Sequence, residues 1–336
     1  MADATEGHER PVTPEERLAL AHDLEASNRS ADAVLVYYRA IIESQREGRW
    51  LSAASTPPAL LGAVRHAMRT VKAGRRRAFE DALAPVRARH GGTALARFDA
   101  CLENLTGEKR ATVADPRQRP TILYFPGLPA SPWFGREQFP WFAVLEAATA
   151  AIRDELEAVM PRAEQGERVF ADDAAEQRGL AGIQGAPTWN GIYFWRHGEP
   201  RADTLALCPR TTALLAGLPL CRIREHAPEV MFSVLTPGTH ILPHRGVTNT
   251  RVVCHLPLIV PEDCALVVGG KAHAWREGEA VAFDDTYEHE AWNRSEQTRV
   301  ILIFDIWNPY MTEPERVAIR DIVADIGEFR GATDGV

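Results

Sequence analysis

The sequence predicts an α+β protein, with helices in its N-terminal part and short antiparallel strands in most of its C-terminal part. The first observation is that apolar residues recur at helical spacing up to about residue 105. The second is that, from about residue 191 to residue 308, short apolar segments alternate with turn residues such as Pro237-Gly238 and Gly269-Gly270. Between these parts, residues 106–120 are polar, charged and interrupted by proline, which is typical of a boundary between domains.

Five helices are expected in the N-terminal part, and the first has the clearest signal. Thr13 is a candidate N-cap, Pro14 follows at the first helical position, and two glutamates occupy the first turn. The other expected helices begin near Ser30 and Pro57 and cover about 75–89 and 93–105. We expect an all-α helical-hairpin domain over residues 1–112 with a flexible start at 1–12. A tetratricopeptide array is one alternative, although no clean 34-residue repeat is visible.

A linker is expected over residues 113–120, a second domain over 121–320 and a C-terminal tail over 321–336. The second domain is expected to begin with a strand at 121–125 and a long amphipathic helix at about 141–159. Further strands are expected at about 192–195, 230–236, 251–260, 265–268, 272–276, 280–283, 290–293 and 298–307. Many short strands at such spacing predict an antiparallel sandwich or barrel.

The composition excludes several classes of protein. With 45% hydrophobic and 25% charged residues, the chain matches an ordinary globular protein. The formal net charge of −8 argues against a general nucleic-acid binder, which is usually basic. No apolar run approaches the roughly 20 residues that span a membrane. The first residues are polar, and the five cysteines are scattered without a CxxC pair, so we expect reduced thiols and a cytoplasmic location.

Histidines gather in the predicted β domain, where five of the eleven fall between residues 240 and 289. His244 follows the turn at Pro243, and His289 begins a later strand. In a rolled antiparallel barrel, strands that are distant in sequence lie side by side, so these two rings can meet at the mouth of the barrel. Neutral imidazole is a good ligand for iron, zinc, copper and nickel. The pattern therefore indicates a metal site.

Arg299 is predicted to lie between packed layers. Side chains alternate between the two faces of a strand, and both faces of the strand at 298–307 are otherwise apolar. A buried guanidinium needs an anionic partner, because an unpaired buried charge is very costly. A carboxylate on a bound small molecule is one candidate partner. The alternatives are an ion pair with Asp284 or Asp285, or contact with solvent.

The stretch from Phe232 to Pro309 resembles the aspartyl/asparaginyl β-hydroxylase family of Fe(II)- and 2-oxoglutarate-dependent oxygenases. The resemblance is carried by PGTHILPHRGVTNTRVVCHLPLIVP, by WREGEAVAFDDTYEHEAWN and by TRVILIFDIWNP, which occur in the family's order. An upstream segment, YFPGLPASPWF, is also similar, so the resemblance covers about residues 120–312. It implies a double-stranded β-helix, or jelly roll, as the catalytic core, with flanking helices.

The resemblance implies roles for individual residues. His244 and His289 match the two histidines that bind Fe(II). His255 and Arg299 match residues that hold the carboxylates of 2-oxoglutarate, with Arg299 on the distal one. Ser233 matches a serine near this cosubstrate. The implied catalytic residues are therefore His244, His289 and Arg299, and the implied cofactors are Fe(II), 2-oxoglutarate and O2.

Two positions bear on how the site differs from related oxygenases. Many of these enzymes have a carboxylate two residues after the first histidine, where this chain has Gly246; the resembled branch commonly lacks that acid. Some family members have an arginine two residues before the cosubstrate histidine, where this chain has Val253. Arg251 lies on the same predicted face and is a candidate to compensate as a cosubstrate ligand.

The expected function is hydroxylation of an aspartyl, asparaginyl or related polar unit in a small molecule, a peptide or a protein. One alternative is a halogenase or another 2-oxoglutarate-dependent oxidase, because Gly246 leaves room for a halide. Another is a non-catalytic jelly-roll binding module joined to a helical interaction domain. The N-terminal helices either dock a protein partner or pack on the catalytic domain. Neither a nucleic acid nor a membrane span is expected.

Overall fold

The computed structural model describes residues 13–334 except 47, 162–166, 170–179, 183–187 and 225. The chain divides into two compact units, residues 1–85 with 325–336, and residues 86–324. The flexible start predicted for residues 1–12 lies outside the described residues. Helices and antiparallel sheets occur together, as the sequence predicts.

The first unit contains α1 (Pro14–Ala26), α2 (Ser30–Arg46) and the greater part of α3 (Leu61–His90), which follows the short 3₁₀ helix η1 (Pro58–Leu60). The predicted N-cap is confirmed: the Thr13 side chain accepts a hydrogen bond from the Glu16 backbone, and Glu16 returns one to the Thr13 N–H. The helices bury a shared core that includes Ala21, Tyr37 and Ala67. Burial of this apolar stripe holds the helices together.

The separate helix expected at 75–89 is wrong, because α3 runs without a break from Leu61 to His90. Gly74 explains why. A Cβ atom at this position would lie 2.5 Å from Cγ2 of Val34 on α2, so the glycine allows close packing of two helices and does not end one. The next elements are η2 (Gly92–Leu95) and α4 (Ala96–Thr106), which ends at the left-handed Gly107.

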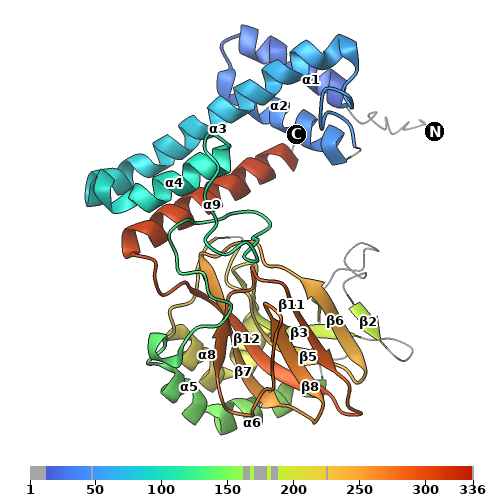
Figure 1. Cartoon of the computed structure of the whole chain (residues 1–336), viewed down its shortest axis with the longest axis vertical. Coiled ribbons are helices and arrows are strands. Elements are labelled where there is room, and N and C mark those ends of the chain that lie inside the picture. The colour runs from blue at the N-terminus through green and yellow to red at the C-terminus, as the bar shows by residue number, and fades with distance from the viewer. Residues whose placement is uncertain are drawn as a thin grey trace, which may run out of the picture. The chain divides into compact units, whose positions relative to one another are not determined.

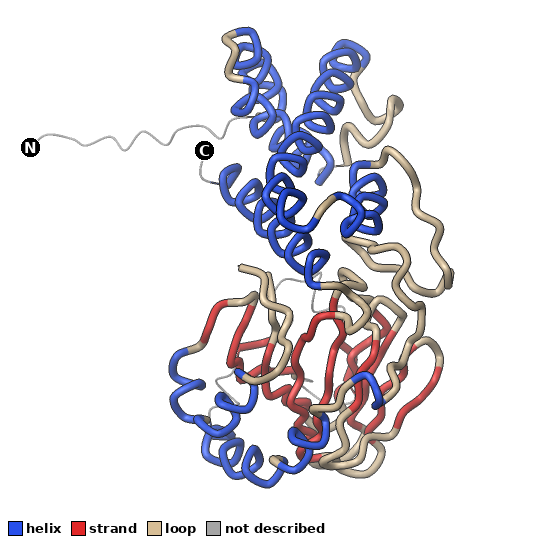
Figure 2. Tube along the Cα trace, turned by 90° about the vertical axis from the view of Figure 1, so that its left-hand side faces the viewer, coloured by secondary structure: helices blue, strands red, loops and turns tan. Residues whose placement is uncertain are grey.

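The second unit is built on two antiparallel sheets among the described residues (Figures 1 and 2). The first has the order β1-β3-β5-β12-β7-β10, with β4 beside β3, and the second has the order β2-β6-β11-β8-β9. The strands of the first sheet are β1 (Glu167–Arg168), β3 (Trp189–Arg196), β4 (Glu199–Pro200), β5 (Val230–Leu235), β7 (Arg251–Ile259), β10 (Val281–Phe283) and β12 (Arg299–Trp307). Those of the second are β2 (Leu180–Gly182), β6 (Thr239–His244), β8 (Cys264–Val268), β9 (Lys271–His273) and β11 (His289–Asn293).

The first sheet is covered on one face by helices and turned on the other toward the second sheet (Figure 1). The covering helices are α5 (Phe142–Ala147), α6 (Thr149–Val159) and α8 (Pro209–Ala216), and α7 (Ala202–Leu207) lies beside β3. Alternate residues of β12, such as Leu302 and Phe304, pack in this helical layer. On the opposite face of the strand, Arg299, Ile303 and Asp305 line a cavity.

Each strand expected between residues 192 and 307 overlaps an observed strand, whereas several other elements were predicted wrongly. The segment 121–125 forms only one isolated bridge, from Leu123 to Thr248. The helix expected at 141–159 is divided at Ala148 into α5 and α6. Strand β6, helices α7 and α8, and α9 (Glu313–Asp334), which takes up most of the expected tail, were not predicted.

The segment expected as a linker, residues 113–120, lies within the second unit and is hydrogen-bonded to the loop between β10 and β11. Gln118 Nε2 donates to Asp284 Oδ2 at 2.6 Å, and the Arg119 N–H donates to the Thr286 carbonyl at 3.0 Å. Just beyond it, the Thr121 N–H donates to the Gly246 carbonyl at 3.1 Å. Within the described part of the chain, none of the helices is long and apolar enough to cross a membrane.

One buried carboxylate fixes the helical layer. Glu155 on α6 is 6% exposed and accepts hydrogen bonds from the backbone N–H groups of Arg210 and Thr211, and from the Thr211 hydroxyl, at 2.7–2.8 Å. These donors lie in the first turn of α8, where backbone N–H groups have no partner within the helix. Burial raises the pKa of Glu155, but the hydrogen bonds outweigh burial and hold the pKa below its usual value.

We expect Glu155→Gln to lower the free energy of unfolding by about 2 kcal/mol at pH 7, because a charged acceptor of several buried hydrogen bonds is lost. The folded-state pKa lies below the unfolded-state value, so this contribution is present above the usual carboxyl pKa and is lost as the pH falls through the folded-state pKa. Urea unfolding at pH 7 and at pH 4 measures both effects. Glu157→Gln, an exposed position on the same helix, is the control; equal stability of the two variants at pH 7 would contradict the assignment.

Candidate functional site

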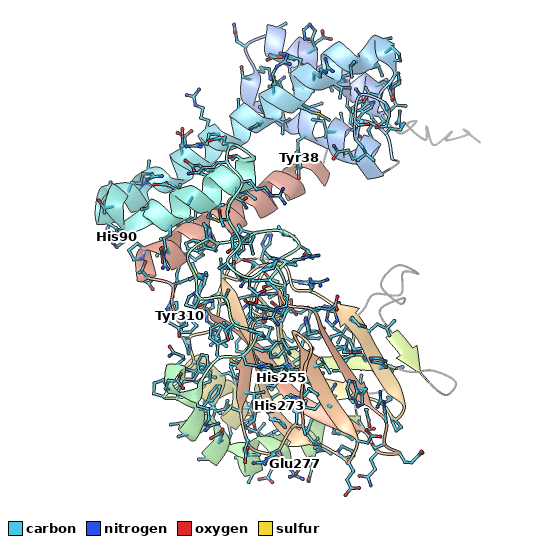
Figure 3. All side chains as sticks on the ribbon, viewed as in Figure 1. Tyr38, His90, His255, His273, Glu277 and Tyr310 are labelled. Atoms are coloured by element: carbon cyan, nitrogen blue, oxygen red, sulfur yellow. The ribbon has the colours of Figure 1, made fainter. Side chains whose placement is uncertain are left out.

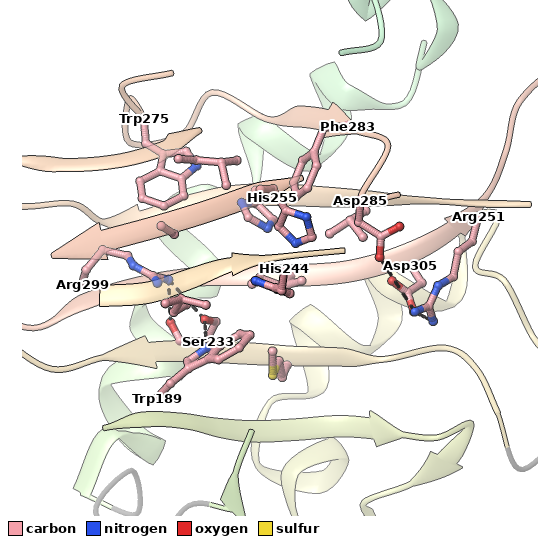
Figure 4. A pocket seen from close by; sticks show the side chains of 17 residues that line it. Trp189, Ser233, His244, Arg251, His255, Trp275, Phe283, Asp285, Arg299 and Asp305 are labelled. Carbon is pink, nitrogen blue, oxygen red and sulfur yellow. Dashed lines mark hydrogen bonds and ion pairs between the residues drawn. The ribbon is translucent and has the colours of Figure 1, made fainter. Parts of the chain in front are cut away.

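The two sheets of the second unit enclose a cavity of about 160 Å³, shown in Figure 4. Its walls come from the faces of β3, β5, β7, β10 and β12 in the first sheet and of β6, β8 and β11 in the second. The polar lining residues are Ser233, His244, Arg251, His255, Asp285, His289, Arg299 and Asp305, and the rest are mostly apolar. All six residues that the sequence singled out for the site therefore line one cavity.

His244 and His289 lie side by side although they are far apart in the sequence. His244 ends β6, His289 begins β11, and the two residues are paired directly across these antiparallel strands. Their ring centroids are 4.0 Å apart. The sequence placed His244 after a turn at Pro243, but Pro243 lies within β6, so strand pairing positions the ring.

The two rings have matching hydrogen bonds. Nδ1 of His244 donates to the Leu242 carbonyl at 2.8 Å, and Nδ1 of His289 donates to the Tyr287 carbonyl at 3.1 Å. Because Nδ1 carries the proton, the lone pair of each neutral ring is on Nε2. Burial lowers the pKa of His244, and burial together with the neighbouring His244 lowers the pKa of His289 to about 3. Both rings are therefore neutral at physiological pH, as metal binding requires.

Arg299 is 1% exposed and has no carboxylate partner among the described residues. Its Nη1 donates to the carbonyl and hydroxyl oxygens of Ser233 at 3.3 and 3.2 Å, and its guanidinium lies 5.2 Å from the ring centroid of Trp275. Burial lowers the pKa of Arg299 to about 10, so the side chain still carries its charge at neutral pH. Neither Asp284 nor Asp285, the partners considered from the sequence, pairs with it. The cation therefore lacks an anion.

Ser233 and His255 lie between Arg299 and the histidine pair. The Ser233 hydroxyl, which is fully buried, also accepts a hydrogen bond from Trp189 Nε1 at 2.8 Å. His255 is 6% exposed, lies among the strands in Figure 3, and its ring is edge-on to Phe283. Burial, followed by the charge of Arg299, lowers the pKa of His255 well below its usual range, so this ring is neutral.

Arg251 lies at the opposite end of the cavity from Arg299 (Figure 4). Its Nη1 is 2.7 Å from Asp305 Oδ2, and its Nη2 is 4.0 Å from Asp285 Oδ2. Unlike Arg299, it has carboxylate partners within the protein. Its expected role as a ligand of the cosubstrate remains a prediction.

The sequence did not single out Asp305 or Trp275. Asp305 was detectable, because it continues the alternation of residues 299, 301 and 303 along one strand. Trp275 had no such signal, since it lies in the loop after β9. Its importance follows from the fold, which places its ring under the Arg299 guanidinium.

Buried polar atoms without a hydrogen-bond partner gather around this cavity. Among the described residues, such atoms include Nδ1 of His255, Nε1 of Trp275, Nε of Arg251, Oδ1 of Asp285 and Nε of Arg299. Buried polar groups are normally paired, so each of these needs an explanation. Four are nitrogens, of which the arginine and tryptophan atoms are N–H donors. The cavity is therefore suited to a ligand that carries acceptor oxygens.

Asp285 fills the space next to Gly246. A Cβ atom on Gly246 would lie 2.0 Å from Asp285 Oδ2, so no side chain fits at this position with the carboxyl group in place. The Gly246 N–H also donates to the Asp285 carbonyl at 2.7 Å. The carboxyl group of Asp285 thus lies beside the position two residues after His244.

This donor set fits a divalent iron ion. Two neutral imidazoles present Nε2 lone pairs on one side of a cavity, while a cation without an anionic partner lies deeper in the same cavity. Imidazole ligands with open coordination positions are typical of non-haem Fe(II) sites.

Comparison with protein families identifies the part of the chain that carries this site. The profile described as "Aspartyl/Asparaginyl beta-hydroxylase" matches residues 146–309. That range includes every residue named above as lining the cavity.

Individual proteins that are similar to this chain also have hydroxylase in their names. The chain is 34% identical over 211 residues to aspartate beta-hydroxylase domain-containing protein 2 of Xenopus tropicalis, covering 62% of this chain and 55% of that protein. It is 32% identical over 223 residues to human aspartyl/asparaginyl beta-hydroxylase, covering 64% of this chain and 28% of that protein. It is 35% identical over 181 residues to ornithine lipid ester-linked acyl 2-hydroxylase of Rhizobium tropici, covering 53% of this chain and 61% of that protein.

The chain therefore spans only part of the length of these relatives, about half in the case of the Xenopus protein. The resemblance seen in the sequence is confirmed by the profile match and by these relatives together. Residues 146–309 of the chain therefore match the aspartyl/asparaginyl β-hydroxylase family.

Proposed function

We propose that this protein is an Fe(II)- and 2-oxoglutarate-dependent dioxygenase that hydroxylates an aspartyl, asparaginyl or related polar substrate. One observation carries the proposal. Arg299 is buried without a carboxylate partner among the described residues, and it shares a cavity with two neutral imidazoles that face each other. A dicarboxylate that also chelates a metal ion would satisfy both features.

The sheet order supports a double-stranded β-helix as the core. From β5 to β12, the chain passes between the two sheets, and only β8 and β9 are consecutive strands of one sheet. The resulting orders, β5-β12-β7-β10 and β6-β11-β8-β9, are those of two interlocked Greek keys, as in a jelly roll. This topology brings β6 and β11 together, and with them the two histidines.

His244 and His289 would hold the iron through Nε2. Their Nδ1 hydrogen bonds to backbone carbonyls fix the ring orientation and the tautomer. When bound, iron with 2-oxoglutarate and O2 supplies the oxidation of an unactivated C–H bond to an alcohol, with 2-oxoglutarate converted to succinate and CO2.

Arg299 would bind the distal carboxylate of 2-oxoglutarate. Ser233 and Trp275 hold the guanidinium in place, and the unpartnered Nε offers a second donor next to Nη for a two-point contact. His255 lies between this end and the histidine pair and would contact the same ligand. The apolar lining, which includes Ile303 and Phe283, keeps water away from the reacting atoms.

The halogenase alternative is disfavoured by Asp285. A halide next to Gly246 would lie against the Asp285 carboxyl group, which already occupies that space. Burial raises the pKa of Asp285 to about 7, so the exclusion of a halide rests on the space that this carboxyl group fills and not on charge repulsion. The space beside Gly246 therefore favours hydroxylation over halogenation.

The proposed substrate class is based on the names of similar proteins. Their names include aspartyl and asparaginyl units and a lipid-linked acyl chain, so a screen has to cover peptides, free amino acids and acyl amides. Binding of a protein partner by the N-terminal helices and a cytoplasmic location remain predictions.

We expect Arg299→Gln to weaken the binding of 2-oxoglutarate by roughly 30-fold or more, because removing one partner of a buried charge pair costs about 2 kcal/mol or more. The same variant should bind 2-oxobutyrate, which lacks the distal carboxylate, as well as wild type does. Calorimetric titration with Fe(II) present and O2 excluded measures both. Arg294→Gln, an exposed arginine, is the control. Equal loss for both ligands would contradict the role of Arg299.

His244→Ala and His289→Ala should each lower Fe(II) affinity and succinate formation by roughly 100-fold or more, since loss of a direct ligand exceeds the loss seen for outer partners. Anaerobic equilibrium dialysis measures iron, and NMR measures succinate. His240→Ala is the matched control, because His240 lies on the same strand and pairs with Glu290. Unchanged iron binding in both site variants would refute the metal site.

For turnover products, we expect the substrate to gain one oxygen atom from O2, with no dependence on chloride or bromide. Mass spectrometry under ¹⁸O2, across a panel of aspartyl- and asparaginyl-containing peptides, measures this. The physical reason is the Asp285 carboxyl group beside Gly246. A halogenated product, or turnover that requires halide, would reverse the choice between the two reactions.

A further inference from the structure

Three potential metal ligands converge in the first compact unit, on helices that the proposed reaction does not use. His22 and Glu25 lie on α1, and His66 lies on α3. One ligand atom from each lies within 4.8 Å of the others.

The sequence and the packing explain why they meet. His22 and Glu25 are three residues apart, so they project from one face of α1. Their neighbours in sequence, Ala21 on α1 and Ala67 on α3, are fully buried in the same core. The three polar side chains therefore lie beside a core to which both α1 and α3 contribute.

The carboxylate is already oriented. Glu25 Oε2 lies 2.6 Å from Nε2 of His66 and accepts a hydrogen bond from the Tyr37 hydroxyl at 3.1 Å. Tyr37 is 1% exposed, so its ring is held in the core while its hydroxyl donates to Glu25. A buried hydroxyl behind a carboxylate is the kind of outer partner that orients metal ligands. The His22 and His66 rings are edge to face, with centroids 6.4 Å apart.

We propose that His22, Glu25 and His66 form a second metal site, which binds a divalent first-row transition metal of the zinc class. Two imidazoles and one carboxylate are a common zinc donor set, with water in the fourth position. Ligand bonds of about 2.1 Å separate tetrahedral donor atoms by about 3.4 Å, so modest side-chain rotations convert the arrangement into a site. His22 is exposed and His66 is partly exposed, which leaves room for these rotations and for the water. The metal would tie α1 to α3.

The competing explanation is a metal-free ion pair between Glu25 and His66, in which His22 has no part. Full-length, tag-free protein tests the two against each other. A His244→Ala/His289→Ala background removes the candidate iron site, so that its metal binding does not obscure the result. Titration with Co(II) gives visible d–d absorption, and competition with Zn(II) gives the zinc affinity.

We expect the background protein to bind one equivalent of Co(II) with four- or five-coordinate absorption, and Zn(II) to displace it and raise the thermal midpoint. Wild type should bind one equivalent more. If the proposed iron site is wrong, wild type and background bind equally, while the second site is still detected. The titration can therefore contradict the proposed iron site without contradicting the second metal site, and the reverse.

Within this background, His22→Ala and Glu25→Gln should each abolish stoichiometric binding, and Tyr37→Phe should weaken it roughly 10-fold. His90→Ala, an exposed histidine at the end of α3, is the control and should bind as the background does. Circular dichroism verifies the helices of each variant. Absence of stoichiometric binding in the background, or binding unchanged by both His22→Ala and Glu25→Gln, would overturn the second site.

Discussion

The pairing of β6 with β11 is the constraint on which the site depends. It sets His244 directly opposite His289, and each ring donates its Nδ1 proton to the carbonyl two residues earlier in its own chain segment. The two rings are therefore held in equivalent ways by their own strands. A slip of one residue in this pairing would turn one ring to the other face of the sheet, because strand side chains alternate.

The two ends of the cavity each bury an arginine, but only one of the two has a carboxylate partner among the described residues. Arg251 is neutralised within the protein by Asp305 and lies near Asp285. Arg299 has only neutral oxygen acceptors and the face of Trp275. An unpaired buried charge lowers stability, so its presence needs a reason other than folding. The contrast supports the proposed ligand-binding role of Arg299, whose charge the protein itself leaves without a carboxylate among the described residues.

The strands that carry the site were predictable because their side chains follow a period of two and are bounded by turn residues. Burial of Arg299 followed from the apolar residues on both faces of its strand. Strand β6 was not predictable, since Pro237, Gly238 and Pro243 all signal turns, yet Thr239–His244 pairs with β11. The break at Ala148 and the contact of Arg251 with Asp305 depend on tertiary packing, which no local pattern records.

Residues before position 146 help to hold the histidine loops. Gln118 bonds to Asp284, in the loop that leads to His289, and Thr121 bonds to Gly246, two residues after His244. One extended segment is thus joined to both loops and restrains their separation, although it belongs to neither sheet. Because the family match begins at residue 146, the geometry at the edge that carries the two histidines depends partly on a segment outside the matched range. Its hydrogen bonds add a restraint on the two rings that is independent of the β6–β11 pairing.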